Sequence, residues 1–175
     1  MGSGGLVYLP YVSGILSAYI KTSKILNKNI KVMPFIFIPD TVNNLIKNYK
    51  NTSVAAFSIS MWNEQISLKL ARKVKQLFPN CLIIFGGPQC PHDPTDYMKN
   101  NKFIDICVRA EGEDAFFEIM TKYISGGKIY KGIPNTAYRV DSDIVINTEK
   151  PNFVKDLDIY PSPYLTGEYD YILKN

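Results

Sequence analysis

Two apolar runs of strand length, each closed by small residues, constrain the fold of this chain most strongly. Residues 54–57 and 81–85 are continuously hydrophobic; Ser58 ends the first strand-like segment, 54–58, and Gly86 and Gly87 follow the second. Because strands buried on both faces have this pattern, the two runs predict neighbouring strands of a parallel sheet. Ligands of such sheets bind at the carboxyl ends of the strands, so Ser58 and Gly86 mark the edge to examine.

The rest of the chain alternates between strand-like and helical patterns, which predicts a doubly wound α/β fold. Further strand-like runs at 6–9, 32–38 and 103–108 bring the expected parallel strands to five, with Pro34 arguing for a sheet edge. After Gly127 the pattern changes to a predicted β-hairpin and then to a proline-punctuated linker. We therefore expect an α/β domain over 1–127, and a C-terminal β-hairpin with linker over 128–175.

Composition excludes several classes of partner. The net charge of +4 is spread along the chain, and the basic residues within 69–75 suit a solvated helix face, so we expect no nucleic-acid partner. No apolar run approaches the length of a membrane span, so no membrane partner is expected either. The three cysteines fit no metal-ligand spacing, and Cys81 and Cys107 are expected as buried, reduced residues in a cytoplasmic protein.

The usual phosphate cradles are missing from the strand ends. The sequence has no GxxxxGK[ST] loop, and the turn after the first predicted strand, at 10–14, has no GxGxxG pattern. Nor do Ser58, Ser60 and Gly86 supply the acidic cluster of a phospho-receiver domain. What remains is a ligand with an extended part that passes between strand ends and bonds to serine hydroxyls and glycine amides.

Four short stretches occur in order along the chain, namely residues 58–63, Gly86-Gly87-Pro88, Glu111-Gly112-Glu113 and residues 161–164. In their order and spacing they resemble the amino-terminal cobalamin-binding domain of cobalamin-dependent radical-SAM enzymes. The turn from Leu9 through Tyr11 to Gly14 is similar to the first strand-to-helix turn of that family, and the resemblance extends over residues 6–165. It implies a flavodoxin-like, Rossmann-like sheet of order 2-1-3-4-5, with the nucleotide tail of cobalamin inserted at the switch point.

The resemblance also implies the residues of a cofactor site. Ser58 and Ser60 would line the tail, Gly86 and Gly87 would let it pass, and Trp62 and Asn63 would approach the corrin ring. The Glu111-Gly112 turn would close the far side. The complete set of predicted cofactor-binding residues is Tyr11, Ser58, Ser60, Met61, Trp62, Asn63, Gly86, Gly87, Pro88, Gln89, Glu111 and Gly112. No catalytic residue and no protein ligand to a metal is predicted.

Eight of these residues also have a purely structural interpretation. The two serines would satisfy backbone groups at a strand end, and the two glycines would serve a tight turn. Trp62 would be a core lid, and Asn63 would cap the helix that follows it. Tyr11 would pack within its loop, and Glu111 would bond neighbouring amides.

The sequence departs from the family at three points. The Asp-x-His-x-x-Gly signature of many cobalamin domains is absent, and the only histidine, His92, follows the fourth predicted strand, which excludes a histidine ligand from the usual loop. Ala110 stands where the family often has glycine. No Cys-x-x-x-Cys-x-x-Cys is present, so we expect the iron–sulfur cluster and S-adenosylmethionine in a missing C-terminal radical-SAM domain, with this chain inactive alone.

Three hypotheses of function follow. The first is the cobalamin-binding domain of a radical-SAM enzyme, for which a methyltransferase is one option, and it holds cobalamin at the carboxyl edge of the sheet. The alternative is a cofactor-free docking or substrate-recognition domain of the same fold. A flavodoxin-like binder of another nucleotide comes third, because the phosphate cradles are missing.

Overall fold

The computed structural model describes residues 8–128, 130–149 and 156–174. The chain divides into two compact units. We call residues 41–154 the sheet unit, and residues 1–40 with 155–175 the helical unit. These bounds differ from the expected domains 1–127 and 128–175, which remain a prediction about the organisation of the protein.

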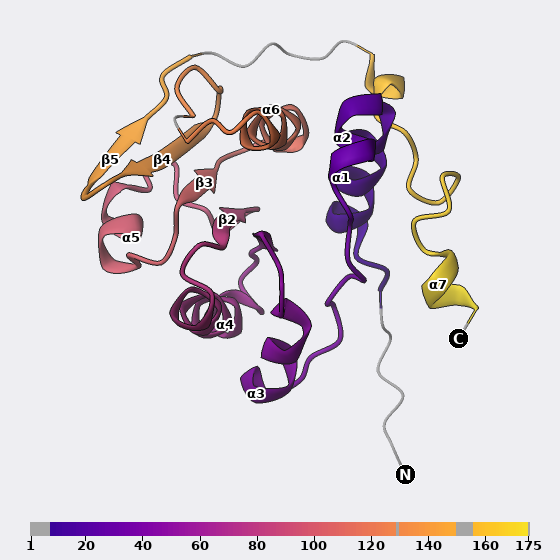
Figure 1. The fold of residues 1–175 in the computed structure, drawn as a ribbon, viewed down its shortest axis with the longest axis horizontal. Coiled ribbons are helices and arrows are strands. Elements are labelled where there is room, and N and C mark those ends of the chain that lie inside the picture. Colours follow the sequence, from indigo (N-terminus) through magenta and orange to yellow (C-terminus); the bar gives the residue numbers. More distant parts are fainter. Residues whose placement is uncertain (1–7, 129, 150–155, 175) are drawn as a thin grey trace. The chain divides into compact units, whose positions relative to one another are not determined.

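The sheet unit contains a five-stranded sheet of order β1-β2-β3-β4-β5 (Figure 1). Its strands are β1 (Val54–Ser58), β2 (Leu82–Gly86), β3 (Ile106–Val108), β4 (Thr136–Val140) and β5 (Asp143–Ile146). The first three are parallel, whereas β4 is antiparallel to β3 and β5 is antiparallel to β4. The predicted α/β class is confirmed, and three of the predicted strands are β1, β2 and β3.

The observed sheet differs from the predicted one, which had five parallel strands in the order 2-1-3-4-5. Residues 32–38 form no strand, because Pro34 has no N–H and the N–H of Phe35 donates instead to the hydroxyl of Tyr171 at 2.7 Å. Of the predicted strand 6–9, Leu6 and Val7 lie outside the described residues, and Tyr8 and Leu9 have no regular structure. The predicted C-terminal hairpin supplies the other two strands instead.

Helices cover both faces of the sheet, which is why β2 is apolar throughout. On one face α4 (Glu64–Leu77) and α5 (Thr95–Asn100) pack over Phe57, Phe85 and Cys107. On the other face α6 (Glu113–Ile124) packs over Ile84 and Ile106. Consecutive strand residues point to opposite faces, so Ile84 and Phe85 enter different cores.

Two further sets of contacts join helices of the sheet unit to its strands. Asp105, just before β3, accepts hydrogen bonds from the ammonium group of Lys75 and from the amide of Ile83, both at 2.7 Å. Near β1, α3 (Val42–Leu45) leads into the short helix η1 (Ile46–Tyr49), and the ring of Tyr49 stacks on Phe57 with centroids 6.0 Å apart. The Asp105 contacts join α4, β2 and β3, and the ring contact joins η1 to β1.

The helical unit joins the two ends of the chain. It contains α1 (Tyr11–Thr22), α2 (Lys24–Asn29), η2 (Leu157–Ile159) and α7 (Asp170–Leu173). The buried carboxylate of Glu168 accepts hydrogen bonds from Ser17 at 2.6 Å and from Lys21 at 2.7 Å. The stretch predicted as an extended linker therefore leads into a segment that packs on the first helix.

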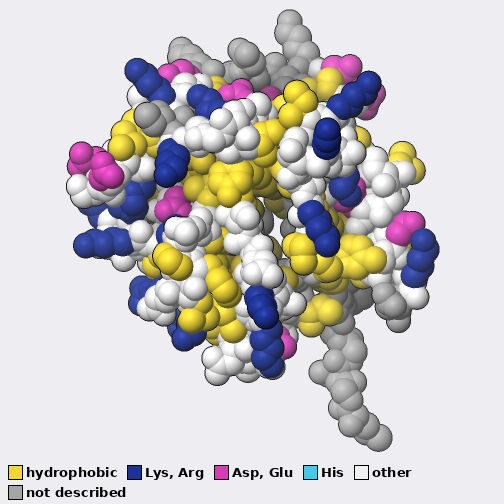
Figure 2. All heavy atoms as spheres, in the orientation of Figure 1, with side chains coloured by type: hydrophobic (Ala, Val, Ile, Leu, Met, Phe, Trp, Pro, Cys, Tyr) yellow, Lys and Arg dark blue, Asp and Glu magenta, His cyan; other side chains and the backbone are white. Residues whose placement is uncertain are grey.

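Two surface properties bear on partners. Lys and Arg side chains are scattered over the visible face in Figure 2 and lie among acidic and neutral ones. Within the described ranges, no helix is both long enough and apolar enough to cross a bilayer. The expectation of no nucleic-acid and no membrane partner remains a prediction.

Candidate binding site at the carboxyl edge of the sheet

The parallel register brings three loops to one edge of the sheet. Ser58 pairs with Gly86, and Gly86 pairs with Val108, so β1, β2 and β3 all end at this edge. The last residues of β1 and β2 and the loops that follow the three strands carry every predicted site residue except Tyr11, which lies on α1 in the helical unit. The predicted residues at the edge are Ser58, Ser60, Met61, Trp62, Asn63, Gly86, Gly87, Pro88, Gln89, Glu111 and Gly112.

Asn63 braces the loop after β1. Its side-chain oxygen accepts a hydrogen bond from the amide of Ser60 at 2.7 Å, and its side-chain nitrogen donates to the carbonyl of Ser58 at 3.0 Å. Asn63 does stand at the position that precedes α4, as the structural interpretation predicts, but its side chain makes no capping hydrogen bond. It shapes the loop instead of the helix.

We expect the substitution Asn63→Ala to lower the free energy of unfolding by about 2 kcal/mol, because two hydrogen bonds to backbone groups are lost. Chemical denaturation followed by circular dichroism measures this change, and faster hydrogen exchange at the Ser60 amide would localise it. Gln76→Ala, at an exposed position of α4, is the control and should change stability little. Equal effects of the two substitutions would contradict the bracing role.

Met61 and Trp62 form an exposed apolar tip on this loop. Trp62 is 83% exposed and Met61 is 78% exposed, so Trp62 is no lid on the core. The core-lid interpretation of Trp62 is therefore wrong. Large aromatic side chains gain most from contact with another apolar surface, so this tip is suited to contact a ligand or another protein.

The two serines of the edge have hydroxyl groups that are available to a ligand. Ser58 and Ser60 are both half-buried, and neither hydroxyl forms a hydrogen bond to any described residue. The backbone groups of this loop are bonded by Asn63 and by the first turn of α4. The structural interpretation of the serines, that they satisfy backbone groups, thus has no contact to support it.

Gly87 lacks a side chain for a reason that involves no ligand. Its φ of +106° favours glycine, and a Cβ there would lie 2.6 Å from the carbonyl oxygen of Ile59. The amide of Ile59 in turn donates to the carbonyl of Gly86 at 2.7 Å, so the loops after β1 and β2 cross in close contact. A Cβ on Gly86, by contrast, would meet Val108 at an ordinary 3.5 Å.

In the turn after β3, Ala110 has a φ of +53°, a conformation that glycine adopts without strain. The carboxylate of Glu113 accepts a hydrogen bond from the amide of Gly112 at 3.1 Å. Glu113 thus makes the amide contact considered for Glu111, while Glu111 is exposed.

Arg109 is a residue of this edge that the sequence interpretation missed. Its guanidinium donates to the carbonyl of His92 at 2.8 Å and to the carbonyl of Asn147 at 3.1 Å. It therefore joins the loop after β2 to the chain after β5. A single arginine after a strand has no pattern that predicts this role, because its two partners come from distant parts of the sequence.

The chain is similar in sequence to known methyltransferases. The chain is 28% identical, over 163 residues, to the cobalamin-dependent radical SAM methyltransferase TokK of Streptomyces tokunonensis. It is 28% identical, over 170 residues, to the 2-(S-pantetheinyl)-carbapenam-3-carboxylate methyltransferase of Streptantibioticus cattleyicolor. This chain is homologous to cobalamin-dependent radical SAM methyltransferases. The resemblance predicted from the sequence is thereby confirmed.

These matches cover nearly all of this chain but only a small part of each relative. They include 93% and 97% of this chain, and hence residues of both the sheet unit and the helical unit. The chain spans about a quarter of the length of the same relatives, 24% and 25%. An uncharacterized methyltransferase of Pyrococcus horikoshii, PH0819, is 26% identical over 110 residues. No family model matches the chain.

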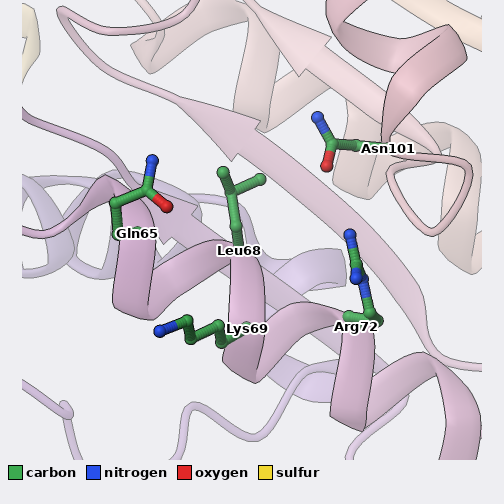
Figure 3. Close-up of a pocket in the computed structure, with 5 residues that line it drawn as sticks. All are labelled: Gln65, Leu68, Lys69, Arg72 and Asn101. Atoms are coloured by element: carbon green, nitrogen blue, oxygen red, sulfur yellow. The ribbon is translucent and has the colours of Figure 1, made fainter.

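The sheet unit has two surface hollows that are lined by residues other than the predicted ones. One, of about 430 Å³, is lined by Asn101 and by four residues of α4, namely Gln65, Leu68, Lys69 and Arg72 (Figure 3). The other, of about 450 Å³, lies where β1 and β2 begin, between residues 51–53 and 77–81. Neither hollow includes a predicted site residue. Within the described ranges, no group of three or more His, Cys, Asp or Glu side chains is arranged to hold a metal ion.

Tyr11 is the first residue of α1 and belongs to the helical unit. The centroids of its ring and the ring of Tyr164 lie 6.4 Å apart, with an angle of 29° between the planes, and its side chain is about half exposed. This contact agrees with the packing interpretation of Tyr11, and its predicted contact with cofactor remains a prediction.

Proposed function

We propose that this chain is the cobalamin-binding part of a radical SAM methyltransferase and holds cobalamin at the carboxyl edge of its sheet. The observation that carries the proposal is the similarity to TokK over 93% of the chain, which includes the sheet and all three loops of the edge. The edge is where ligands of open α/β sheets bind.

The residues of the edge fit such a cofactor. Trp62 and Met61 offer exposed apolar area to a broad, flat ring system, and the free hydroxyls of Ser58 and Ser60 offer hydrogen bonds to a polar tail. Bound there, cobalamin would supply the cobalt centre that carries a methyl group, while the protein positions it and excludes water. The missing side chain of Gly87 adds no support to this fit, because the Ile59 backbone already explains it.

The remaining parts of the proposal concern the whole protein. The sequence contains no Cys-x-x-x-Cys-x-x-Cys, so the iron–sulfur cluster and S-adenosylmethionine would bind in a C-terminal radical-SAM domain, the main partner of this chain. The division into an α/β domain over 1–127 and a hairpin with linker over 128–175 belongs to this proposal, as does a cytoplasmic location.

The proposal is tested by titration of the chain with hydroxocobalamin. Trp62 is the only tryptophan, so its fluorescence should be quenched as the cofactor binds, and the cofactor should comigrate with the protein on gel filtration. We expect Trp62→Ala, measured by equilibrium dialysis, to weaken binding about tenfold, or ~1.4 kcal/mol. The control Leu77→Ala, at an exposed apolar position on the last turn of α4, should leave the affinity unchanged.

A cofactor-free docking domain is the second candidate, and the packing of Gly87 favours it. The close contact with Ile59 explains the glycine without any ligand, and an exposed Met61-Trp62 tip equally suits contact with another protein domain. If a folded chain fails to retain hydroxocobalamin at high micromolar concentration, the docking role is the better description.

A further inference from the structure

The loop after β2 spans residues 87–94 and includes three of the predicted cofactor-binding residues, Gly87, Pro88 and Gln89. Prolines at positions 88, 91 and 94 have no N–H, so the loop can form few backbone hydrogen bonds of its own. The amide of Gln89 donates to the carbonyl of Ile59 at 3.3 Å, which is long for such a bond. The conformation of this loop therefore depends on contacts from other parts of the sheet unit.

Arg109 supplies such a contact to the second half of the loop. It directly follows β3, and its backbone amide donates to the carbonyl of Asn135 at 2.7 Å. Its guanidinium donates to the carbonyl of His92 at 2.8 Å and to the carbonyl of Asn147 at 3.1 Å. Because a guanidinium is planar and its N–H groups have fixed directions, these two bonds set the position of His92 relative to Asn147.

Asn147 is a well-held anchor for this contact. Its buried side chain donates to the carbonyl of Tyr130 and to the hydroxyl of Thr136, both at 2.7 Å. The same side chain accepts a hydrogen bond from the amide of Gly132 at 3.1 Å. Arg109 thus attaches the loop after β2 to a residue that other hydrogen bonds hold in place.

The third donor of Arg109 distinguishes it from a purely structural arginine. Its Nε is buried and has no partner among the described residues. A buried N–H without a partner costs stability, so a position selected for stability alone does not favour this side chain. Arg139 is different, because its Nε donates to the carbonyl of Ile104 at 3.2 Å and its terminal nitrogen to the carbonyl of Met98 at 2.6 Å.

We propose that Arg109 is a positioning residue of the cofactor site, and that it holds the loop after β2 in the conformation that receives cobalamin. The inference rests on the proposed function and deepens it, because it names a residue that acts through the loop rather than by contact with the cofactor. A loop that adopts its binding conformation only part of the time lowers the affinity by that fraction. Loss of the guanidinium therefore weakens binding although every contact residue is still present.

The experiment compares the affinities of the wild-type chain and of Arg109→Ala for hydroxocobalamin by equilibrium dialysis. We expect Arg109→Ala to weaken binding about tenfold, as it would if the loop adopted the binding conformation about a tenth of the time. Arg139→Ala is the matched control, because it also removes an arginine that donates to two carbonyls, here those of Ile104 and of Met98 on α5. It should lower stability in urea and leave the affinity of the folded chain unchanged.

Three further measurements separate positioning from a merely structural role. Guanidinium chloride, far below the concentration that unfolds the chain, should restore binding to Arg109→Ala, whereas sodium chloride at the same concentration should not. Arg109→Lys keeps the charge but cannot donate to both carbonyls in the same geometry, so it should also bind weakly. Without cofactor, hydrogen exchange in residues 88–94 should be faster in Arg109→Ala than in the wild type, and unchanged in Arg139→Ala.

The wild-type result separates this inference from the proposed function. If the wild-type chain retains no hydroxocobalamin, the proposed function fails and the inference fails with it. If the wild type binds and the folded Arg109 variants bind as tightly, the inference alone is overturned. Unchanged exchange in residues 88–94, or an equal loss of affinity in Arg139→Ala, overturns it as well. If neither Arg109 variant folds, Arg109 is a structural residue and the inference is wrong.

Discussion

Gly87→Ala should lower the free energy of unfolding of the chain by about 3 kcal/mol or more, the largest loss that we expect from adding one methyl group. Two causes act together. The φ of +106° at this position is one that alanine rarely adopts, and the added Cβ would lie 2.6 Å from the carbonyl oxygen of Ile59 and 3.0 Å from its amide nitrogen. Both obstacles are backbone atoms, which cannot rotate away as a side chain can.

Gly86→Ala is the matched control for this prediction. A Cβ on Gly86 would meet the Cβ of Val108 at 3.5 Å, so stability should change by about 1 kcal/mol or less. Urea denaturation of both variants, with hydrogen exchange at the Ile59 amide as a local readout, measures the difference. Similar stability of the two variants would show that the crossing of the two loops is not close. If Gly86→Ala folds but binds hydroxocobalamin weakly, the cofactor passes close to Gly86.

Gly14→Ala should loosen the C-terminal segment of the helical unit, at a cost of about 2 kcal/mol. A Cβ on Gly14 would lie 2.6 Å from the Cζ atom of Tyr169 and 2.9 Å from the Cβ of Pro163. Tyr169 is itself almost completely buried, and its hydroxyl lies 3.4 Å from the carbonyl of Pro10, so its ring has no free space to enter. The segment must therefore move away from α1.

Limited proteolysis measures this loosening. Cleavage within residues 160–174 should be at least tenfold faster in Gly14→Ala than in the wild-type chain, because proteolysis of a locally opened segment follows its open population. Ser13→Ala, the preceding position of α1, is the control and should be cleaved at the wild-type rate. Unchanged cleavage of Gly14→Ala would show that the segment does not pack on α1 in solution.

The candidate edge was predictable because it depends on the order of elements along the chain. Residues 54–58, 81–85 and 103–108 are apolar and separated by helical patterns, so their carboxyl ends had to meet at one edge of a parallel sheet. The positions of Trp62 and Asn63 in the loop after β1 follow from the same reasoning. What Asn63 bonds to, and how exposed Trp62 is, depended on atoms that the pattern does not place.

The error in strand order has a similar explanation. Residues 32–38 are apolar enough for a strand, but a strand also needs a partner for its backbone, and the amide of Phe35 bonds to Tyr171 instead. Ile106 and Cys107, in turn, pair with Tyr138 and Ala137 of the hairpin. Both partners are distant in the sequence, so local periodicity carried no information about them.

Local periodicity and turn residues were enough to predict the three parallel strands β1, β2 and β3, the helices between them, and the edge at which their loops meet, because these are local properties of the chain. The pairing of the hairpin with β3, the filling of the space beside Gly87 by the Ile59 backbone, and the hydrogen bonds of Arg109 to His92 and Asn147 were settled by the folded structure alone. Each of these depends on contacts between residues far apart along the chain, which form only when the elements pack together.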